Sequence, residues 1–326
     1  MPLLGQLDVS NLNQTSLSSL TNRIANNPSS HYAYFRRALI YQKTHQNELA
    51  LKDINKALSL DPINTSYTFL KSSIQYELGF LKEALESAEI AANAGLGTPL
   101  FYTHLAKLYI ETDSLHLAGQ YIDEVLILVP KLDDALRLKG KIQMLENEFD
   151  KSLMTLYECL LINNQSPETY DYLAKTFLKI GKLDSAAHAT KLGFKYAESD
   201  NVGLWYNKGK IMERLGKTDS ALVIYNKVLK LDPNANYVYS DKGTIYMNQG
   251  SFSHAVAAFE NAMDKMPNEK SHYLRAGYCL ERLASYNKAQ EIYLKAKTRF
   301  PADPEFAESF NRMTYKLERQ YRAIII

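Results

Sequence analysis

The sequence is poor in the features that mark secreted, metal-binding or membrane-spanning proteins. It has two cysteines, Cys159 and Cys279, and one tryptophan among 326 residues. Neither cysteine lies in a CxxC or Cys/His cluster, so nothing indicates a metal site. There is no run of about 18 apolar residues, so we expect no membrane-spanning helix.

A large net charge and a recognisable leader sequence are also lacking. The 38 Lys and Arg residues nearly balance the 36 Asp and Glu residues, which leaves a formal charge of +2. This balance gives no reason to expect nucleic acid or an anionic membrane as a partner. The opening MPLLGQLDVSNLNQ does not have the basic and apolar regions of a signal peptide. These features favour the cytoplasm, with a periplasmic or cell-envelope location as the alternative if a leader was removed or is missing.

The common catalytic motifs are absent as well. The sequence contains no HExxH, GxSxG, GxGxxG or GxxxxGK[ST]. The seven histidines have no partner at metal-ligand spacing. We therefore expect a protein that is not an enzyme, with no catalytic, cofactor-binding or metal-binding residues.

What the sequence does contain is one pattern written repeatedly. ALKDINKALSLDP at 50–62 and ALVIYNKVLKLDP at 221–233 are nearly the same. Their separation fits a period of 34 residues with one extra residue near Asp200. A period of this length is typical of solenoids built from repeated units. Steps of 34 from His31 give eight units, at 31–64, 65–98, 99–132, 133–166, 167–201, 202–235, 236–269 and 270–302.

Each unit reads as two antiparallel helices. The eighth and twentieth places hold only Ala, Ser or Gly in all eight units. Two helices approach closely only where a side chain is nearly absent, so these places predict the points of contact. Between the helices of the seventh unit lies NQGS, a turn in which glycine permits positive φ. A proline ends the second helix in five units, at Pro62, Pro130, Pro233, Pro267 and Pro301.

These features resemble the tetratricopeptide repeat family. The resemblance is carried by the small pair, the closing proline and an aromatic residue at the fourth place, which is Tyr34, Tyr102, Tyr170, Trp205, Tyr239 or Tyr273. It covers about residues 31–302. It implies an all-α fold, a right-handed α-solenoid or superhelix of about eight helix-turn-helix repeats.

The sequence also predicts a cap at each end of the solenoid. In residues 1–30, Leu17, Leu20 and Ile24 lie on one helical face, as in a half-repeat. In residues 303–326 a second apolar stripe precedes a short apolar tail. This stripe predicts a C-terminal capping helix with a polar outer face, and it consists of Phe306, Phe310, Met313 and Leu317.

Membership of this family would imply a scaffold or adaptor that holds a peptide or protein segment in a concave groove lined by the first helices. The ninth place of four successive units is basic: Lys107, Lys141, Lys175 and Lys210. Further cations stand at neighbouring groove places: Arg137, Lys179 and Arg214. This basic ladder suits an acidic peptide or a chain carboxylate. The alternative is internal pairing with Asp134, Glu168 and Asp171 as ordinary exposed ion pairs.

The first two units present an apolar groove instead. Tyr32, Phe35, Phe69 and Tyr76 stand at the expected concave places, together with Leu39 and Leu70. An exposed apolar strip marks a partner site. Alternatively, the N-terminal cap or the curvature of the solenoid covers it.

Some members of the family clamp the two carboxylates at the acidic tails of heat-shock chaperones. The places of that clamp in the first three units hold residues of other types, so we do not expect this function: Phe35, Leu39, Leu70, Leu100 and His104.

Two other functions stay open. Pentatricopeptide arrays are related solenoids that read single-stranded RNA, although the period and charge here fit them less well. Self-association through the apolar ends, including Ile324, Ile325 and Ile326, would instead make the chain a structural component of a larger assembly, for example in a cell envelope.

Overall fold

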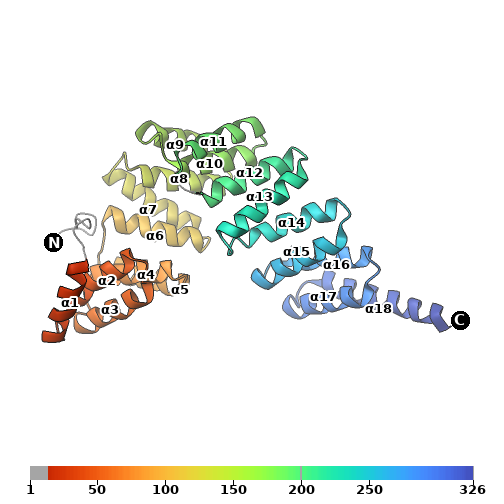
Figure 1. Cartoon of the computed structure of the whole chain (residues 1–326), viewed down its shortest axis with the longest axis horizontal. Helices are drawn as coiled ribbons and strands as arrows, with labels where there is room; N and C mark the ends of the chain where they lie inside the picture. Colours follow the sequence, from red (N-terminus) through yellow and green to blue (C-terminus); the bar gives the residue numbers. More distant parts are fainter. Residues whose placement is uncertain (1–13, 199, 326) are drawn as a thin grey trace. The chain divides into compact units, whose positions relative to one another are not determined.

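The computed structural model describes residues 14–198 and 200–325, and this part of the chain is helical throughout apart from its short connections (Figure 1). The chain divides between Gln165 and Ser166 into two larger parts, called unit 1 and unit 2. The 34-residue segments found in the sequence are called repeats from here on. Unit 1 contains α1 (Gln14–Asn26), α2 (His31–Lys43), α3 (Asn47–Leu60), α4 (Thr65–Glu77), α5 (Leu81–Asn93), α6 (Pro99–Glu111), α7 (Leu115–Leu128), α8 (Asp133–Leu145) and α9 (Phe149–Ile162). Unit 2 contains α10 (Pro167–Lys179), α11 (Leu183–Tyr196), α12 (Val202–Arg214), α13 (Thr218–Leu231), α14 (Tyr237–Asn248), α15 (Phe252–Lys265), α16 (Lys270–Arg282), α17 (Tyr286–Arg299) and α18 (Pro304–Ile325). The prediction of an all-α fold built from helix pairs is confirmed.

The small eighth place receives a large side chain from the partner helix. In unit 2, a Cβ added to Gly243 of α14 would lie 2.6 Å from Cε1 of Phe259 in α15. In unit 1, a Cβ added to Gly140 of α8 would lie 2.6 Å from Cδ2 of Leu156 in α9. Phe259 and Leu156 are both completely buried. The small residue is therefore a socket for a core side chain of the second helix.

Serine occupies the close contact in two pairs of unit 1. The Ser72 hydroxyl donates to the carbonyl of Ala84 at 2.7 Å, and the Ser152 hydroxyl donates to the carbonyl of Gly140 at 2.8 Å. A buried hydroxyl needs a partner, and the facing backbone provides it. Serine therefore fits here as well as alanine or glycine.

The turns inside the helix pairs share one backbone conformation. In the part of the chain that the structure describes, the fifteenth place of each 34-residue step has positive φ, at His45, Gly79, Asp113, Asn147, Gly181, Gly216, Gly250 and Ala284. Gly250, in the NQGS turn, has φ of 75°. Ala284 adopts φ of 54° at the same place, which costs an alanine about 1 kcal/mol. The turn geometry therefore holds even where the residue does not favour it.

The terminal helices cover the ends of their units. In unit 1, α1 packs on α2, and Leu17, Leu20 and Ile24 of α1 are half-buried. In unit 2, Phe306 and Met313 of α18 are fully buried against the preceding helices. The polar side of α18 is anchored too, because Arg312 and Lys316 each contact Glu281 at 2.8 Å. Residues 1–13 of the predicted N-terminal segment, Ile326 and the side chains of Ile324 and Ile325 lie outside the described part.

Candidate functional site

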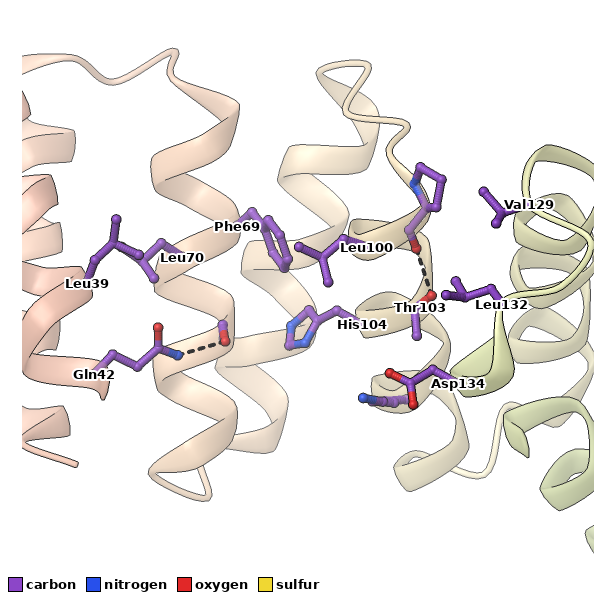
Figure 2. A pocket seen from close by; sticks show the side chains of 13 residues that line it. Leu39, Gln42, Phe69, Leu70, Leu100, Thr103, His104, Val129, Leu132 and Asp134 are labelled. Carbon is purple, nitrogen blue, oxygen red and sulfur yellow. Dashed lines mark hydrogen bonds between the residues drawn. The ribbon is translucent and has the colours of Figure 1, made fainter. Parts of the chain in front are cut away.

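Unit 1 contains a hollow of about 540 Å³ between α2, α4, α6 and the start of α8. Its apolar wall is formed by Leu39, Phe69, Leu70, Leu100, Val129 and Leu132. Figure 2 shows these side chains converging on the space from three neighbouring helices and from the segment before α8. Leu100 and Val129 are exposed at 50% and 39%, so apolar surface remains open to solvent here.

The polar side of the hollow is formed by Thr103, His104 and Lys107 of α6, with Gln42, Ser73 and Asp134 from neighbouring helices. His104 and Lys107 lie one helical turn apart and both line the space. Burial and the nearby Lys107 ammonium together lower the pKa of His104 to about 4. The imidazole is therefore neutral at physiological pH.

The His104 ring is fixed in position by its neighbours. Its Nε2 lies 2.8 Å from Oγ of Ser72. Its centroid is 5.3 Å from that of Phe69 and 6.0 Å from that of Tyr76. In Figure 2 the ring points from α6 toward α4. Sequence reasoning missed this residue as part of a site. The sequence signal for it was Ser72 at the eighth place of one repeat, followed by His104 at the sixth place of the next repeat.

The members of the predicted basic ladder have different surroundings. In unit 1, Lys141 pairs with Glu111 at 3.3 Å and Arg137 pairs with Asp134. Lys107 is partly exposed and makes no hydrogen bond or ion pair with any residue within 14–198 or 200–325. Lys107 therefore brings to the hollow a positive charge that no carboxylate contacts, although Asp134, the partner of Arg137, also lines the space.

Carboxylates contact the two ninth-place lysines of unit 2. Lys175 contacts Asp171 at 2.6 Å. Lys210 contacts Glu213 at 2.8 Å and Asp241 at 3.1 Å. The remaining two cations differ again, since Lys179 is exposed at the end of α10 and Arg214 donates to the carbonyl of Leu178. Internal pairing, the alternative left open by the sequence, therefore takes place at Lys175 and Lys210.

Burial changes the ionisation of the unit 2 carboxylates. The pKa of Asp171 is raised, mainly by burial, although Lys175 and the amide of Asn207 partly offset this. The pKa of Asp241 is also raised by burial, against the stabilising contacts from Lys210 and the Tyr206 hydroxyl. These groups form a paired network inside unit 2, and their lysines are engaged within it.

The predicted aromatic groove residues divide between core and surface. Phe35 is 7% exposed and stacks on Tyr67 with centroids 4.7 Å apart, so it belongs to the core. Phe69 is also buried but lines the hollow. Tyr32 and Tyr76 are exposed at 44% and 36%. Tyr32 accepts a hydrogen bond from Arg36 at 3.0 Å, and Tyr76 packs against His104.

Neither cysteine forms a disulfide, and both are buried. The Cys159 thiol donates to the carbonyl of Asp133 at 3.3 Å. Among the described residues, no group of His, Cys, Asp and Glu side chains is placed to hold a metal ion. Within the same ranges, no helix has both the length and the apolar character needed to cross a bilayer.

Family models show what kind of repeat this is. Three models described as tetratricopeptide repeat match residues 31–64, 202–235 and 240–304. The chain is a tetratricopeptide repeat protein. Several of the curated relatives that it matches are named as tetratricopeptide repeat proteins. The Hsp70-Hsp90 organizing protein of Triticum aestivum is 21% identical over 282 residues, which make up 85% of this chain and 42% of that protein. A tetratricopeptide repeat-containing protein of Methanocaldococcus jannaschii is 25% identical over 264 residues, or 81% of this chain and 43% of that protein. The chain thus spans less than half the length of these relatives.

Solved structures agree on the fold. A tetratricopeptide repeat protein from Parabacteroides merdae has a TM-score of 0.63 at 18% identity, covering 77% of this chain and 99% of its own. A chain of the APC/C hetero-tetramer Cut9-Hcn1 has a TM-score of 0.65 at 13% identity, covering 94% of this chain and 60% of its own. The human IFIT1 dimer with PPP-AAAA has a TM-score of 0.57 at 18% identity, covering 87% of this chain and 72% of its own. At these identities the likeness concerns the fold alone.

Proposed function

We propose that this chain is a non-catalytic protein-interaction scaffold and that unit 1 binds an extended segment of a partner protein in its hollow. One observation carries the proposal: an open apolar wall stands beside an unpaired lysine. The volume of about 540 Å³ lies within the range of about 300–1,000 Å³ that is usual for binding pockets. Apolar pockets with a few placed polar groups are the usual form of such sites.

The partner segment is expected to be acidic next to an apolar side chain. Leu39, Leu70 and Leu100 offer space for an aliphatic or aromatic anchor. Lys107 offers an ammonium without a carboxylate partner, and an anionic residue in the segment would complete the pair. Lys141 has a carboxylate of its own, so it contributes less to binding.

Paired lysines argue against the RNA alternative. An RNA-binding groove presents cations that are free to replace the counterions of phosphates. In unit 2, Lys175 and Lys210 are occupied by Asp171, Glu213 and Asp241. Binding of single-stranded RNA that weakens steeply with salt would favour that alternative over ours.

A peptide array tests the proposed function. Acetylated and amidated dodecapeptides of varied sequence are probed with the full chain, with Leu100→Arg and with Leu161→Arg. Leu100 is exposed and lines the hollow, whereas Leu161 is 88% exposed on α9 and does not. We expect peptides that combine an apolar and an acidic residue to bind the wild type and Leu161→Arg. The same peptides should lose binding to Leu100→Arg.

Two results would contradict this account. Equal binding to both variants would place the site elsewhere on the chain. A complete absence of binding peptides would reject segment recognition by unit 1.

A further inference from the structure

We infer that His104 is a specificity-determining residue of this hollow, and that its Nδ1 accepts a hydrogen bond from an N–H group of the bound segment. This inference rests on the proposed function and deepens it. Together with Lys107, His104 would select a segment that presents a backbone N–H close to an acidic side chain.

The hydrogen bonds of Ser72 determine the tautomer of His104. The Ser72 hydroxyl has one hydrogen, and it donates this hydrogen to the Ala84 carbonyl at 2.7 Å. The contact of 2.8 Å between Ser72 Oγ and His104 Nε2 must then use an oxygen lone pair. Nε2 therefore carries the ring hydrogen and donates it to Ser72. In the neutral ring, the other nitrogen is left as an acceptor.

This acceptor is open toward the hollow. Within the described ranges, Nδ1 of His104 has no hydrogen-bond partner, and it is not enclosed like the orphaned Nδ1 of His272. His104 lines the space, and Phe69 and Tyr76 hold its ring plane. A ligand in the hollow thus meets an oriented lone pair that no described residue uses.

The neutral His104 ring and the neighbouring Lys107 ammonium further restrict which ligand groups can bind. The ring stays uncharged because burial and Lys107 lower its pKa to about 4. A ligand carbonyl would face an acceptor at Nδ1 and gain nothing, whereas a ligand N–H would gain a hydrogen bond. One turn along α6, Lys107 favours a carboxylate. Peptide backbone supplies the N–H, and an aspartate or glutamate side chain supplies the carboxylate.

An internal acidic residue fits better than a chain terminus. Lys107 is a single, partly exposed ammonium. A buried terminal carboxylate needs several donors to offset its loss of hydration. A side-chain carboxylate can reach Lys107 while keeping part of its water. We therefore commit to an internal acidic side chain of an extended segment.

Ester substitution in a bound peptide tests the inference. The probe is the tightest dodecapeptide from the array, with each backbone amide replaced in turn by an ester, which removes one N–H. One ester should weaken binding to the wild type by about 3- to 10-fold, the usual size of one hydrogen bond. The same ester should change binding to His104→Gln by less than about 2-fold, because glutamine can still donate to Ser72 but does not reproduce the Nδ1 acceptor.

Two further readouts separate a specific role from a structural one. Long-range ¹H–¹⁵N spectra of the full chain should show His104 protonated at Nε2 and not at Nδ1. His104→Asn, whose amide oxygen lies near the place of Nδ1, should recover part of the sensitivity to that ester. Repeating the titration with a free C-terminal acid at the position of the acidic side chain distinguishes the two carboxylate sources.

The outcomes distinguish this inference from the proposed function. A proton on Nδ1, or ester effects that are equal in the wild type and His104→Gln, would overturn the role of His104 while leaving peptide binding in unit 1 intact. Stronger binding of the free terminal acid would overturn the choice of an internal acidic side chain. If no peptide of the array binds, both proposals fall.

Discussion

Single residues decide how closely the paired helices approach. Gly243, at the eighth place of its repeat, leaves room for the ring of Phe259. A serine at the eighth place can donate a hydrogen bond to the facing backbone, as Ser72 does to the carbonyl of Ala84. Larger residues have no space because the opposing side chain is completely buried. The eighth place is therefore constrained by packing in every pair where a core side chain fills it.

Gly243→Ala should destabilise the chain although alanine favours helices. The added Cβ would lie 2.6 Å from Phe259, so the ring must move within a packed core. Overpacking of this kind costs about 1–3 kcal/mol, which exceeds the gain of up to about 1 kcal/mol in helix propensity. Urea unfolding measures the difference. Gly119→Ala is the control, because a Cβ there meets no atom within 4 Å, and it should stabilise. Stabilisation by both substitutions would show that the socket has spare room.

His104 should make stability depend on pH in a defined window. Its pKa is about 4 in the folded chain and about 6.5 when unfolded, so the unfolded state binds the extra proton between these values. Stability from this group is therefore complete above about pH 6.5 and falls as the pH drops toward 4, by at most about 1.4 kcal/mol per unit.

The measurement compares unfolding of the wild type and His104→Gln between pH 4 and 7. Other groups titrate in both proteins, so the difference between the two isolates His104. The difference should shrink as the pH falls. A constant difference would mean that His104 titrates normally, and thus that Lys107 and the burial of the ring do not suppress its charge.

At the scale of elements, helices are joined by polar contacts of very different strength. Arg37 of α2 binds Asp53 of α3 through two hydrogen bonds of 2.6 and 2.9 Å, and Asp53 is only 4% exposed. The side chains of Lys139 of α8 and Asp123 of α7 also pair, at 2.8 Å, but they are 37% and 60% exposed. The first is a buried bidentate link and the second a surface ion pair.

Asp53→Ala should cost about 3 kcal/mol, because it leaves Arg37 with an uncompensated and largely buried charge. Asp123→Ala should cost less than about 1 kcal/mol. Denaturant unfolding of both variants checks the contrast. The double substitution Arg37→Met, Asp53→Leu should recover most of the loss. Equal costs for Asp53→Ala and Asp123→Ala would show that burial does not strengthen the α2–α3 link.

Elements are also the scale at which the sequence was most informative. The small places recur in all eight repeats and reflect packing between adjacent helices, and a proline ends the second helix in five of the repeats, so the helix pairs were predictable. The contacts of long polar side chains were not predictable, because their partners lie about one repeat away in the sequence and the pairing depends on the side-chain rotamers. Lys141 binds Glu111 and Lys210 binds Asp241, and neither carboxylate was among the expected partners. His104 was missed for the same reason, since the position of its ring depends on a contact with Ser72 in the preceding repeat.

For the molecule as a whole, repetition builds the helical framework, and the proposed site depends on residues that differ between repeats. The same helix pair recurs in unit 1 and unit 2, and apolar residues of the first three repeats line the hollow of unit 1. The lysine ladder suggested a site spread over four repeats. Carboxylates contact Lys141, Lys175 and Lys210, so Lys107 beside the hollow is the one ninth-place lysine of the ladder for which the described residues provide no contacting carboxylate, and the proposed site centres on it.

The most direct test of the central claim is the affinity of one acidic dodecapeptide for three proteins, measured by isothermal titration calorimetry: the wild type, Lys107→Glu and Lys141→Glu. Both variants make the same charge change at the ninth place of successive repeats in unit 1, one at the unpaired lysine and one at the lysine that contacts Glu111. The account predicts that Lys107→Glu weakens binding by at least about 10-fold and Lys141→Glu by less than about 3-fold. Equal losses would reduce the effect to general electrostatics, and unchanged affinity in Lys107→Glu would contradict the assignment of the hollow as the binding site.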